Sequence, residues 1–225
     1  MKRNRKRGSA IIEFALSLLV LMPLFLGTGA IGINLNRTLQ TVQLARDAGH
    51  MFARGVDFSD PGNQKILATI GTGLGLSATA GQGTAEVIFS ALTYVDGNTC
   101  TAANQLNGNG NAPTCTNLGQ WVFTQRLEIG NTGLRGSNYG SPLTSGPTGV
   151  TLDSQGKISL GQYATRAGAV AQFSSANGIN PYAVVNGVAS GLPSGQKLYL
   201  SEAASQGFGM PPYVQGSPTY SFSFF

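Results

Sequence analysis

The sequence predicts an α+β fold, in which a long N-terminal helix carries a head made of a small antiparallel sheet and short helices. Three observations predict it. An apolar run near the N-terminus leads directly into a polar stretch with helical spacing. Later in the chain, four segments rich in β-branched and aromatic residues are bounded by turn residues. Glycine supplies 32 of the 225 residues and charged residues only 10%, which is typical of an extracytoplasmic protein with generous turns.

The chain begins with a cluster of basic residues: Lys2, Arg3, Arg5, Lys6 and Arg7. This cluster accounts for the net charge of +5, because the remaining Lys and Arg residues are as numerous as the Asp and Glu residues. A nucleic-acid-binding surface needs basic residues gathered on the folded domain. We therefore expect no nucleic-acid partner and interpret the basic cluster as an N-terminal targeting signal.

The apolar run that follows is long enough to cross a membrane. From Ala15 to Ile33 the residues are apolar or small, with three interruptions: Ser17, Pro23 and Thr28. About 20 apolar residues span a bilayer as a helix, which predicts a transmembrane helix over about residues 12–33. Cations precede this run and the next one is Arg37, so we expect a cytoplasmic N-terminus and an extracytoplasmic head.

A secretory signal peptide is the alternative interpretation of this segment. A positive n-region and an apolar h-region are both present, and Thr28 and Ala30 are small enough for a signal peptidase site. Cleavage after Ala30 would leave a soluble mature chain that starts at Ile31. Glu13 would then have no role.

Glu13 stands near the leading edge of the apolar run, where a carboxylate weakens membrane insertion. The cost is about 2.5 to 3.5 kcal/mol at the bilayer centre and less near an end. If the chain were cut after Gly8, Ser9 would be the new N-terminus and Glu13 its fifth residue, followed by Phe14. An isolated carboxylate and an isolated ammonium are each costly at low dielectric, and pairing them across a subunit boundary relieves both.

The segment RGSAIIEFAL has a short basic leader, a glycine, four residues and then Glu-Phe ahead of a long apolar run. It resembles the processing site of type IV pilin-like proteins, and more closely the opening of TadE-like minor pseudopilins of tight-adherence (Tad/Flp) pilus systems. The resemblance covers about residues 7–33 and fades by about residue 55.

This resemblance implies a prepilin-type leader over residues 1–8 that a prepilin peptidase removes by cleavage between Gly8 and Ser9. It implies an assembly role for Glu13 and Phe14, with the Glu13 carboxylate compensating the Ser9 α-amino group of a neighbouring subunit. The implied partners are the prepilin peptidase, other pilin or pseudopilin subunits, the pilus assembly machinery and the bacterial inner membrane.

The helix is predicted to continue beyond the membrane, over residues 9–55 as a whole. Apolar residues recur at steps of three and four: Leu35, Leu39, Val42, Ala45, Gly49 and Phe52. Gly55 is a natural C-terminal stop. Pro23 should kink or locally unwind the helix, because proline removes one backbone donor. The head then occupies residues 56–225.

The first half of the head predicts one short helix and two strands. Asp60 and Pro61 suit the cap and first turn of a helix that runs to about Ile70. Residues 85–95 and 120–129 have the β-branched and aromatic composition of strands.

In the second half, residues 130–157 predict a long, polar and flexible loop. Helical spacing from Leu160 predicts a helix that stops at Asn177-Gly178, and Asn180-Pro181 opens another short helix through about Ala189. Two further strands are predicted over 197–203 and 219–225.

The two cysteines, Cys100 and Cys115, lie in the loop between the first two predicted strands. An even count in an extracytoplasmic chain predicts a disulfide that closes the loop of this hairpin. A ring of this size contributes about 3 kcal/mol by loop-closure arithmetic.

The sequence shows no pattern typical of an active site or a metal site. His50 is the only histidine, Asp47 lies three residues away on the same predicted helix, and no nucleophile elbow occurs. Gly71, Gly73 and Gly75 follow a helix, whereas a dinucleotide-binding loop follows a strand. We therefore expect no enzyme activity, no cofactor and no metal.

Two competing interpretations remain open. One is a secreted or membrane-anchored binding protein unrelated to pili. The other is a membrane-anchored hydrolase, which would require folding to gather two or three acids around His50.

Overall fold

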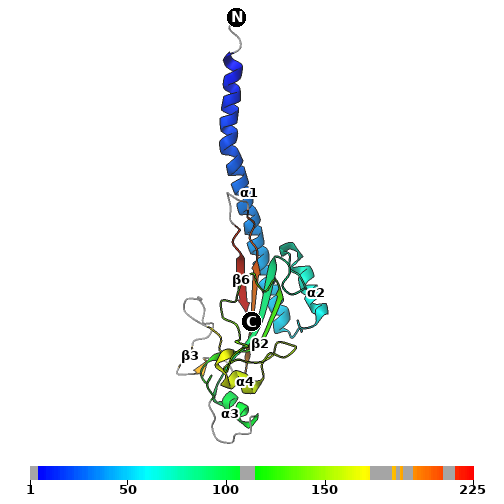
Figure 1. Cartoon of the computed structure of the whole chain (residues 1–225), viewed down its shortest axis with the longest axis vertical. Helices are drawn as coiled ribbons and strands as arrows, with labels where there is room; N and C mark the ends of the chain where they lie inside the picture. Colours follow the sequence, from blue (N-terminus) through cyan, green and yellow to red (C-terminus); the bar gives the residue numbers. More distant parts are fainter. Residues whose placement is uncertain (1–4, 107–114, 173–183, 186–187, 190–194, 210–215) are drawn as a thin grey trace.

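The computed structural model describes residues 5–106, 115–172, 184–185, 188–189, 195–209 and 216–225. It confirms the predicted α+β fold. Figure 1 shows a long helix whose N-terminal half stands clear of a head, and the head contains a four-stranded antiparallel sheet with short helices around it.

The long helix, α1 (Arg5–Ala53), begins inside the predicted leader and ends close to the predicted Gly55. Gly55 has a φ of 88°, and its N–H donates to the Phe52 carbonyl at 2.9 Å, while the Val56 N–H donates to the Met51 carbonyl at 3.1 Å. These two bonds form a Schellman motif, which satisfies the last carbonyls of the helix.

The helix continues through Pro23, so local unwinding, one of the two predicted outcomes, is wrong, and a kink stays a prediction. Proline removes a single backbone donor. The backbone hydrogen bonds of the adjoining turns keep the helix continuous at this position.

The sheet has the strand order β2-β1-β5-β6, and every neighbouring pair is antiparallel. Its strands are the four that the sequence predicts: β1 (Ala85–Tyr94), β2 (Trp121–Gly130), β5 (Lys197–Ser205) and β6 (Thr219–Phe224). β1 lies inside the sheet between β2 and β5, and all ten of its residues are buried. One register shift, between Ala91 and Leu92, interrupts its pairing with β2.

The two faces of this sheet have different covers. The C-terminal part of α1 packs on one face, together with α2 (Pro61–Ile70) and the turn η1 (Thr72–Leu74). That core is apolar and contains Leu44, Ala45, Ala48, Phe52, Phe58, Leu67, Leu74, Leu76, Ala85, Val87, Phe89, Ala91, Ile129 and Ala203. The loop after β2 and the helices α3 (Gly97–Leu106) and α4 (Leu160–Thr165) cover the other face.

The predicted helix after Asp60 is confirmed as α2. The Asp60 Oδ1 atom accepts a hydrogen bond from the Gly62 N–H at 2.6 Å, and Pro61 occupies the first turn. This is the arrangement that an acidic N-cap followed by proline favours.

The stretch between β1 and β2 was predicted as a loop, and this prediction is incomplete because α3 lies there. The Asp96 Oδ1 atom accepts hydrogen bonds from the Thr99 N–H at 2.8 Å and the Thr99 hydroxyl at 2.7 Å. Asp96 is therefore an N-cap of the kind found at Asp60.

The helix predicted from Leu160 is much shorter than expected. It ends at Thr165, and the turn η2 (Ala167–Ala169) follows Arg166, which is extended at φ −106° and ψ 124°. The Ala171 N–H donates to the Trp121 carbonyl at 2.8 Å. The chain therefore pairs with the edge of β2 here and does not continue as a helix. The predicted stop at Asn177-Gly178 lies outside the described residues.

The helix predicted through Ala189 is wrong where it can be compared. Two short antiparallel strands, β3 (Val184–Val185) and β4 (Val188–Ala189), lie there instead. β-branched valines on both sides of an Asn-Gly pair are a hairpin signal, which outweighs the helix-opening proline. Asn180-Pro181 lies outside the described residues.

Apart from Gly130, residues 130–157 form neither a helix nor a named strand, as predicted for a loop. They pack on the sheet, and Tyr139 and Val150 are buried. The Arg126 N–H donates to the Gly156 carbonyl at 2.8 Å. The flexibility of this loop stays a prediction.

Candidate assembly site

The N-terminal half of α1 is an apolar helix that stands clear of the head (Figure 1), and its residues 11–26 are all exposed. Phe14 is 66% exposed and Phe25 is 77% exposed. Among the described residues, α1 is the one helix long and apolar enough to cross a membrane. Side chains of this kind are stable only against lipid or other apolar helices, because exposure to water costs about 25 cal/mol for each Å² of apolar surface.

The predicted processing residues, Gly8 and Ser9, lie in the first turns of α1. Their side chains are outside the described part of the chain. Glu13 and Phe14 follow one turn later, and both side chains are exposed. The Glu13 carbonyl accepts a hydrogen bond from the Ser17 hydroxyl at 2.9 Å. The four predicted residues therefore share one helix end, far from the head.

The apolar half of α1 ends where the head begins to hold the helix. Asn34 makes two hydrogen bonds with the backbone of Phe208: its Nδ2 donates to the carbonyl at 3.1 Å, and its Oδ1 accepts from the N–H at 2.8 Å. One turn further, Arg37 donates to the Gln206 carbonyl at 2.6 Å. Thr41 then joins a chain of hydroxyl groups, lying 2.8 Å from the Ser205 Oγ.

At Gly49 the backbone of α1 lies close to the sheet. A Cβ atom built on Gly49 would lie 2.9 Å from the Ser201 Cβ and 2.9 Å from the Phe225 Cδ2. Only glycine lets the helix backbone lie this near to β5 and the C-terminal end of β6. The small residues Ala45 and Ala48 on the same face serve the same packing.

Residues 8–50 match the family model described as TadE-like protein. The match begins at the predicted processing glycine and ends at the part of α1 that packs on the sheet. No curated protein and no solved structure matches the chain. The TadE-like segment, residues 8–50, therefore combines the exposed apolar half of α1 with most of its head-docking half.

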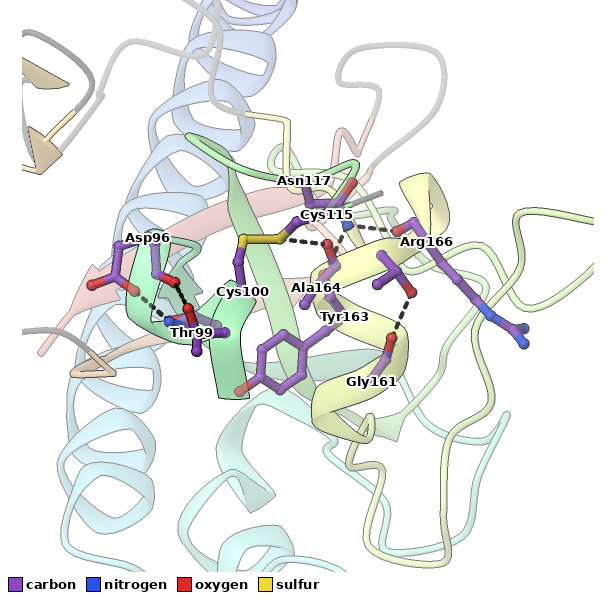
Figure 2. The surroundings of a disulfide bond; sticks show 12 residues. Asp96, Thr99, Cys100, Cys115, Asn117, Gly161, Tyr163, Ala164 and Arg166 are labelled. Carbon is purple, nitrogen blue, oxygen red and sulfur yellow. Dashed lines mark hydrogen bonds between the residues drawn. A yellow bond between two sulfur atoms is a disulfide. The ribbon is translucent and has the colours of Figure 1, made fainter. Parts of the chain in front are cut away.

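The predicted pair Cys100 and Cys115 forms a disulfide with a Cα–Cα distance of 5.7 Å. Cys100 belongs to α3, which lies at the end of the head farthest from the N-terminus of α1 (Figure 1). Figure 2 shows how the disulfide joins α3 to the edge of α4: the Cys115 Sγ lies 3.5 Å from the Ala164 carbonyl. The buried Asn117 side chain donates to the carbonyls of Tyr163 and Arg166 at 2.8 and 2.7 Å. The disulfide therefore supports the fold and lies apart from the predicted processing site.

Sequence reasoning missed a cluster of buried polar side chains on the sheet face away from α1. Glu86 on β1 and Glu202 on β5 are each 1% exposed. Glu202 accepts hydrogen bonds from the Ser137 hydroxyl at 2.6 Å, the Asn138 N–H at 3.2 Å and the Tyr220 hydroxyl. Its Oε2 also lies 3.7 Å from the Arg126 Nη1.

Glu86 is held by fewer partners than Glu202. Its Oε2 accepts the Arg135 N–H at 3.1 Å. The pKa of Glu86 is raised to about 7, mainly by burial and to a smaller extent by the nearby Glu128 and Glu202, while the Arg135 hydrogen bond and the Arg126 charge oppose the rise. Burial also raises the pKa of Tyr139 to about 12, with a smaller contribution from Glu202.

This cluster could not be read from the sequence, because its acids are one per strand and look scattered. The signal that was present is the phase of each strand: Glu86 and Glu202 occupy core-facing positions among residues that are otherwise apolar. A charged residue in a buried phase is rare unless it is paired. The position of each carboxylate therefore predicts a polar partner on another strand, but it does not identify that partner.

The cluster does not form the active site that the hydrolase interpretation requires. His50 lies on α1, where its ring packs against the Phe225 ring at a centroid distance of 4.4 Å, on the other side of the sheet from Glu86 and Glu202. Within the described part of the chain no group of His, Cys, Asp and Glu side chains is placed to hold a metal ion.

Proposed function

We propose that this protein is a structural TadE-like minor pseudopilin that acts in the assembly of a Tad/Flp-type IV pilus. The observation that carries the proposal is the family match over residues 8–50, which opens at Gly8. The exposed apolar half of α1 supports it, because an assembling subunit needs a helix that can leave lipid for the apolar helices of other subunits. The role is structural and not catalytic.

In this proposal a prepilin peptidase hydrolyses the peptide bond between Gly8 and Ser9. Water adds to the Gly8 carbonyl carbon, the Ser9 nitrogen leaves with a proton, and the new Ser9 α-amino group becomes a cation. The Glu13 carboxylate of a neighbouring subunit compensates this charge inside the apolar surroundings. Glu13 and Phe14 lie exposed on α1, which supports contacts with other subunits and the assembly machinery.

The proposed location is the bacterial inner membrane, with a cytoplasmic N-terminus and a periplasmic head. The basic cluster before the apolar run supports this orientation. The Cys100–Cys115 disulfide supports a head in an oxidising compartment. The partners would be the peptidase, pilin or pseudopilin subunits and the membrane, without nucleic acid.

The first test is the N-terminal residue of the full-length protein purified from membranes, determined by intact mass and terminal peptide mapping. A chain that starts at Ser9 supports the proposal. A chain that starts at Ile31 indicates a secreted binding protein, and an intact Met1 indicates a plain anchor; either result overturns the pseudopilin assignment.

Matched glycine variants make this test specific. Gly8→Leu should leave the leader uncleaved, because the peptidase needs a small residue before the cut. Gly29→Ala is the control, since a Cβ atom there meets no other atom within 4 Å. Glu13→Gln should then be processed normally and fail in pilus assembly, and normal assembly of this variant would remove the proposed role of Glu13.

A further inference from the structure

The connection between β5 and β6 follows α1 towards the apolar half of the helix. Three contacts mark its course: Gly49 meets Ser201, Thr41 meets Ser205, and Asn34 meets Phe208. From Gly49 to Asn34 the helix rises about 22 Å at 1.5 Å per residue. Seven residues of extended chain cover about 23 Å. The two lengths agree, so β5 and the residues after it run antiparallel to α1 as far as Asn34.

The segment that leaves β5 and the segment that enters β6 stay close together beyond the end of the sheet. A Cβ atom on Gly216 would lie 2.5 Å from the Gly207 carbonyl oxygen, and one on Gly207 would lie 3.1 Å from the Ser217 carbonyl carbon. Glycines at both positions therefore allow the two segments, residues 206–209 and 216–218, to lie close together, and we call this pair of segments the stem. The stem holds Phe208 beside α1.

The level of Phe208 relative to a bilayer follows from the length of the apolar half of α1. Residues 11–33 rise about 35 Å, whereas the hydrocarbon core is about 30 Å thick and the whole bilayer with headgroups about 40 to 45 Å. When the apolar half spans the core, Asn34 lies within the headgroup layer. Phe208 lies at the same level, because both of its backbone polar groups bond to Asn34.

One further observation agrees with this level. The sequence contains no charged side chain from residue 203 to residue 225. Aromatic residues are enriched at the headgroup layer, and an uncharged connection enters it at low cost.

We propose that the stem around Phe208 is a second membrane contact, inserted into the lipid headgroup layer of the leaflet that faces the head. The head would then sit directly on the bilayer, with Arg37 at the phosphate level and its guanidinium held by the Gln206 carbonyl. The occupant of this surface is lipid and not another protein, since the contact continues the apolar segment of α1 without a break. This inference rests on the membrane anchor proposed above.

The test uses tryptophan as a depth reporter, because Trp121 is the only tryptophan in the chain and is buried in the head. In a Trp121→Phe background of the full chain, Phe208→Trp is placed in vesicles of phosphatidylcholine and phosphatidylglycerol. Lipids brominated near the headgroup should quench its fluorescence more strongly than lipids brominated near the chain end. A second reporter, Gln206→Trp, should behave in the same way, because the Gln206 side chain is exposed and its substitution leaves the backbone bond to Arg37 in place.

Two control reporters separate the failure of this inference from the failure of the anchor. Phe25→Trp lies near the middle of the apolar half and should be quenched best by lipids brominated near the chain end. Leu143→Trp lies at the distal side of the head, beside Gly168, and should not be quenched.

Quenching of Phe25→Trp without quenching of Phe208→Trp and Gln206→Trp would overturn the headgroup contact alone. Blue-shifted but unquenched emission at 208 would mean that protein covers this surface, and would also overturn it. Equal quenching at 143 would mean that the whole head lies on the membrane without a specific contact. An unquenched Phe25→Trp would overturn the anchor, and with it the proposed function.

Discussion

The two faces of the sheet are both buried, but they are covered in different ways. The face towards α1 is packed with aliphatic and aromatic side chains, such as Val87 and Phe89 from β1. The opposite face buries Glu86 and Glu202, and Arg126 forms ion pairs there with Glu128 and Glu202. One strand, β1, contributes to both faces with alternate residues.

The difference follows from what covers each face. A helix satisfies its own backbone N–H and C=O groups, so α1 can lie on a mostly apolar surface in which Ser201 and Ser205 are the buried polar side chains of β5. A loop does not, and a buried backbone N–H without a partner is costly. The loop after β2 therefore lies on carboxylates: Glu86 accepts the Arg135 N–H and Glu202 accepts the Asn138 N–H. The lesson is that buried carboxyl groups on this sheet accept the hydrogen bonds of loop N–H groups that have no partner within the loop.

The largest expected effect is on the apolar face, where Phe52→Ala should destabilise the head by about 3 to 5 kcal/mol. The Phe52 ring is buried and lies 5.0 Å from the Phe89 ring and 5.3 Å from the Tyr199 ring. Thermal unfolding of the detergent-solubilised protein, followed by near-ultraviolet circular dichroism, measures the loss. Phe25→Ala makes the same chemical change on the same helix outside the head, and should leave the transition unchanged. Equal losses in both variants would contradict the division of α1.

On the polar face we expect stability to depend on pH through Glu86. Its folded-state pKa, about 7, is raised above the ordinary 4.5, so the folded head favours the protonated carboxyl. Its contribution is complete below pH 4.5 and is lost as the pH rises through about 7. A shift of this size corresponds to up to about 3 kcal/mol.

Glu86→Gln should therefore unfold at a higher temperature than the unsubstituted protein at pH 8. It should also lose the change in stability between pH 4.5 and about pH 7. Gln keeps an acceptor for the Arg135 N–H. Glu128→Gln is the control: Glu128 is partly exposed, and its removal should lower the pKa of Glu86 only modestly and keep most of the pH dependence. An unchanged pH profile for Glu86→Gln would show that this carboxyl stays ionised in the fold.

A smaller effect is expected for Gly49→Ala, about 1 to 3 kcal/mol, since the added methyl group meets the Phe225 ring and Ser201. Gly32→Ala, in the exposed half of the same helix, has open space around the new methyl group and should not change the unfolding of the head. Chemical denaturation in detergent compares the two. If Gly49→Ala proved as stable as Gly32→Ala, the close approach of α1 to β5 would be wrong.

Local chemistry was enough to predict several parts of this protein. The apolar run and the helical spacing after it predicted α1 to within a few residues at its C-terminal end, because Gly55 is the one residue there suited to a left-handed stop. The strand compositions predicted β1 and β2, and Asp60 predicted the start of α2. With two cysteines in the chain, one intramolecular pairing was available.

The failed predictions have different causes. The helix after Leu160 ends early because Ala171 pairs with Trp121 of β2, a distant segment, and no local residue shows this. Local propensity is a weak guide when long-range pairing competes with it. The helix α3 and the hairpin of β3 and β4 follow instead from local signals that the sequence interpretation missed, the Asp96 cap and the valines on both sides of an Asn-Gly pair.

The sequence by itself therefore determined the anchor-like helix, the TadE-like match over residues 8–50 and the class of the fold, since each depends on neighbours within a few turns of chain. Tertiary structure alone decided the strand order, the buried cluster of Glu86 and Glu202, and the contact of Asn34 with Phe208, which is 174 residues away. These features require side chains from distant segments to meet. Their positions follow from the packing of the whole head, which no short window of sequence contains.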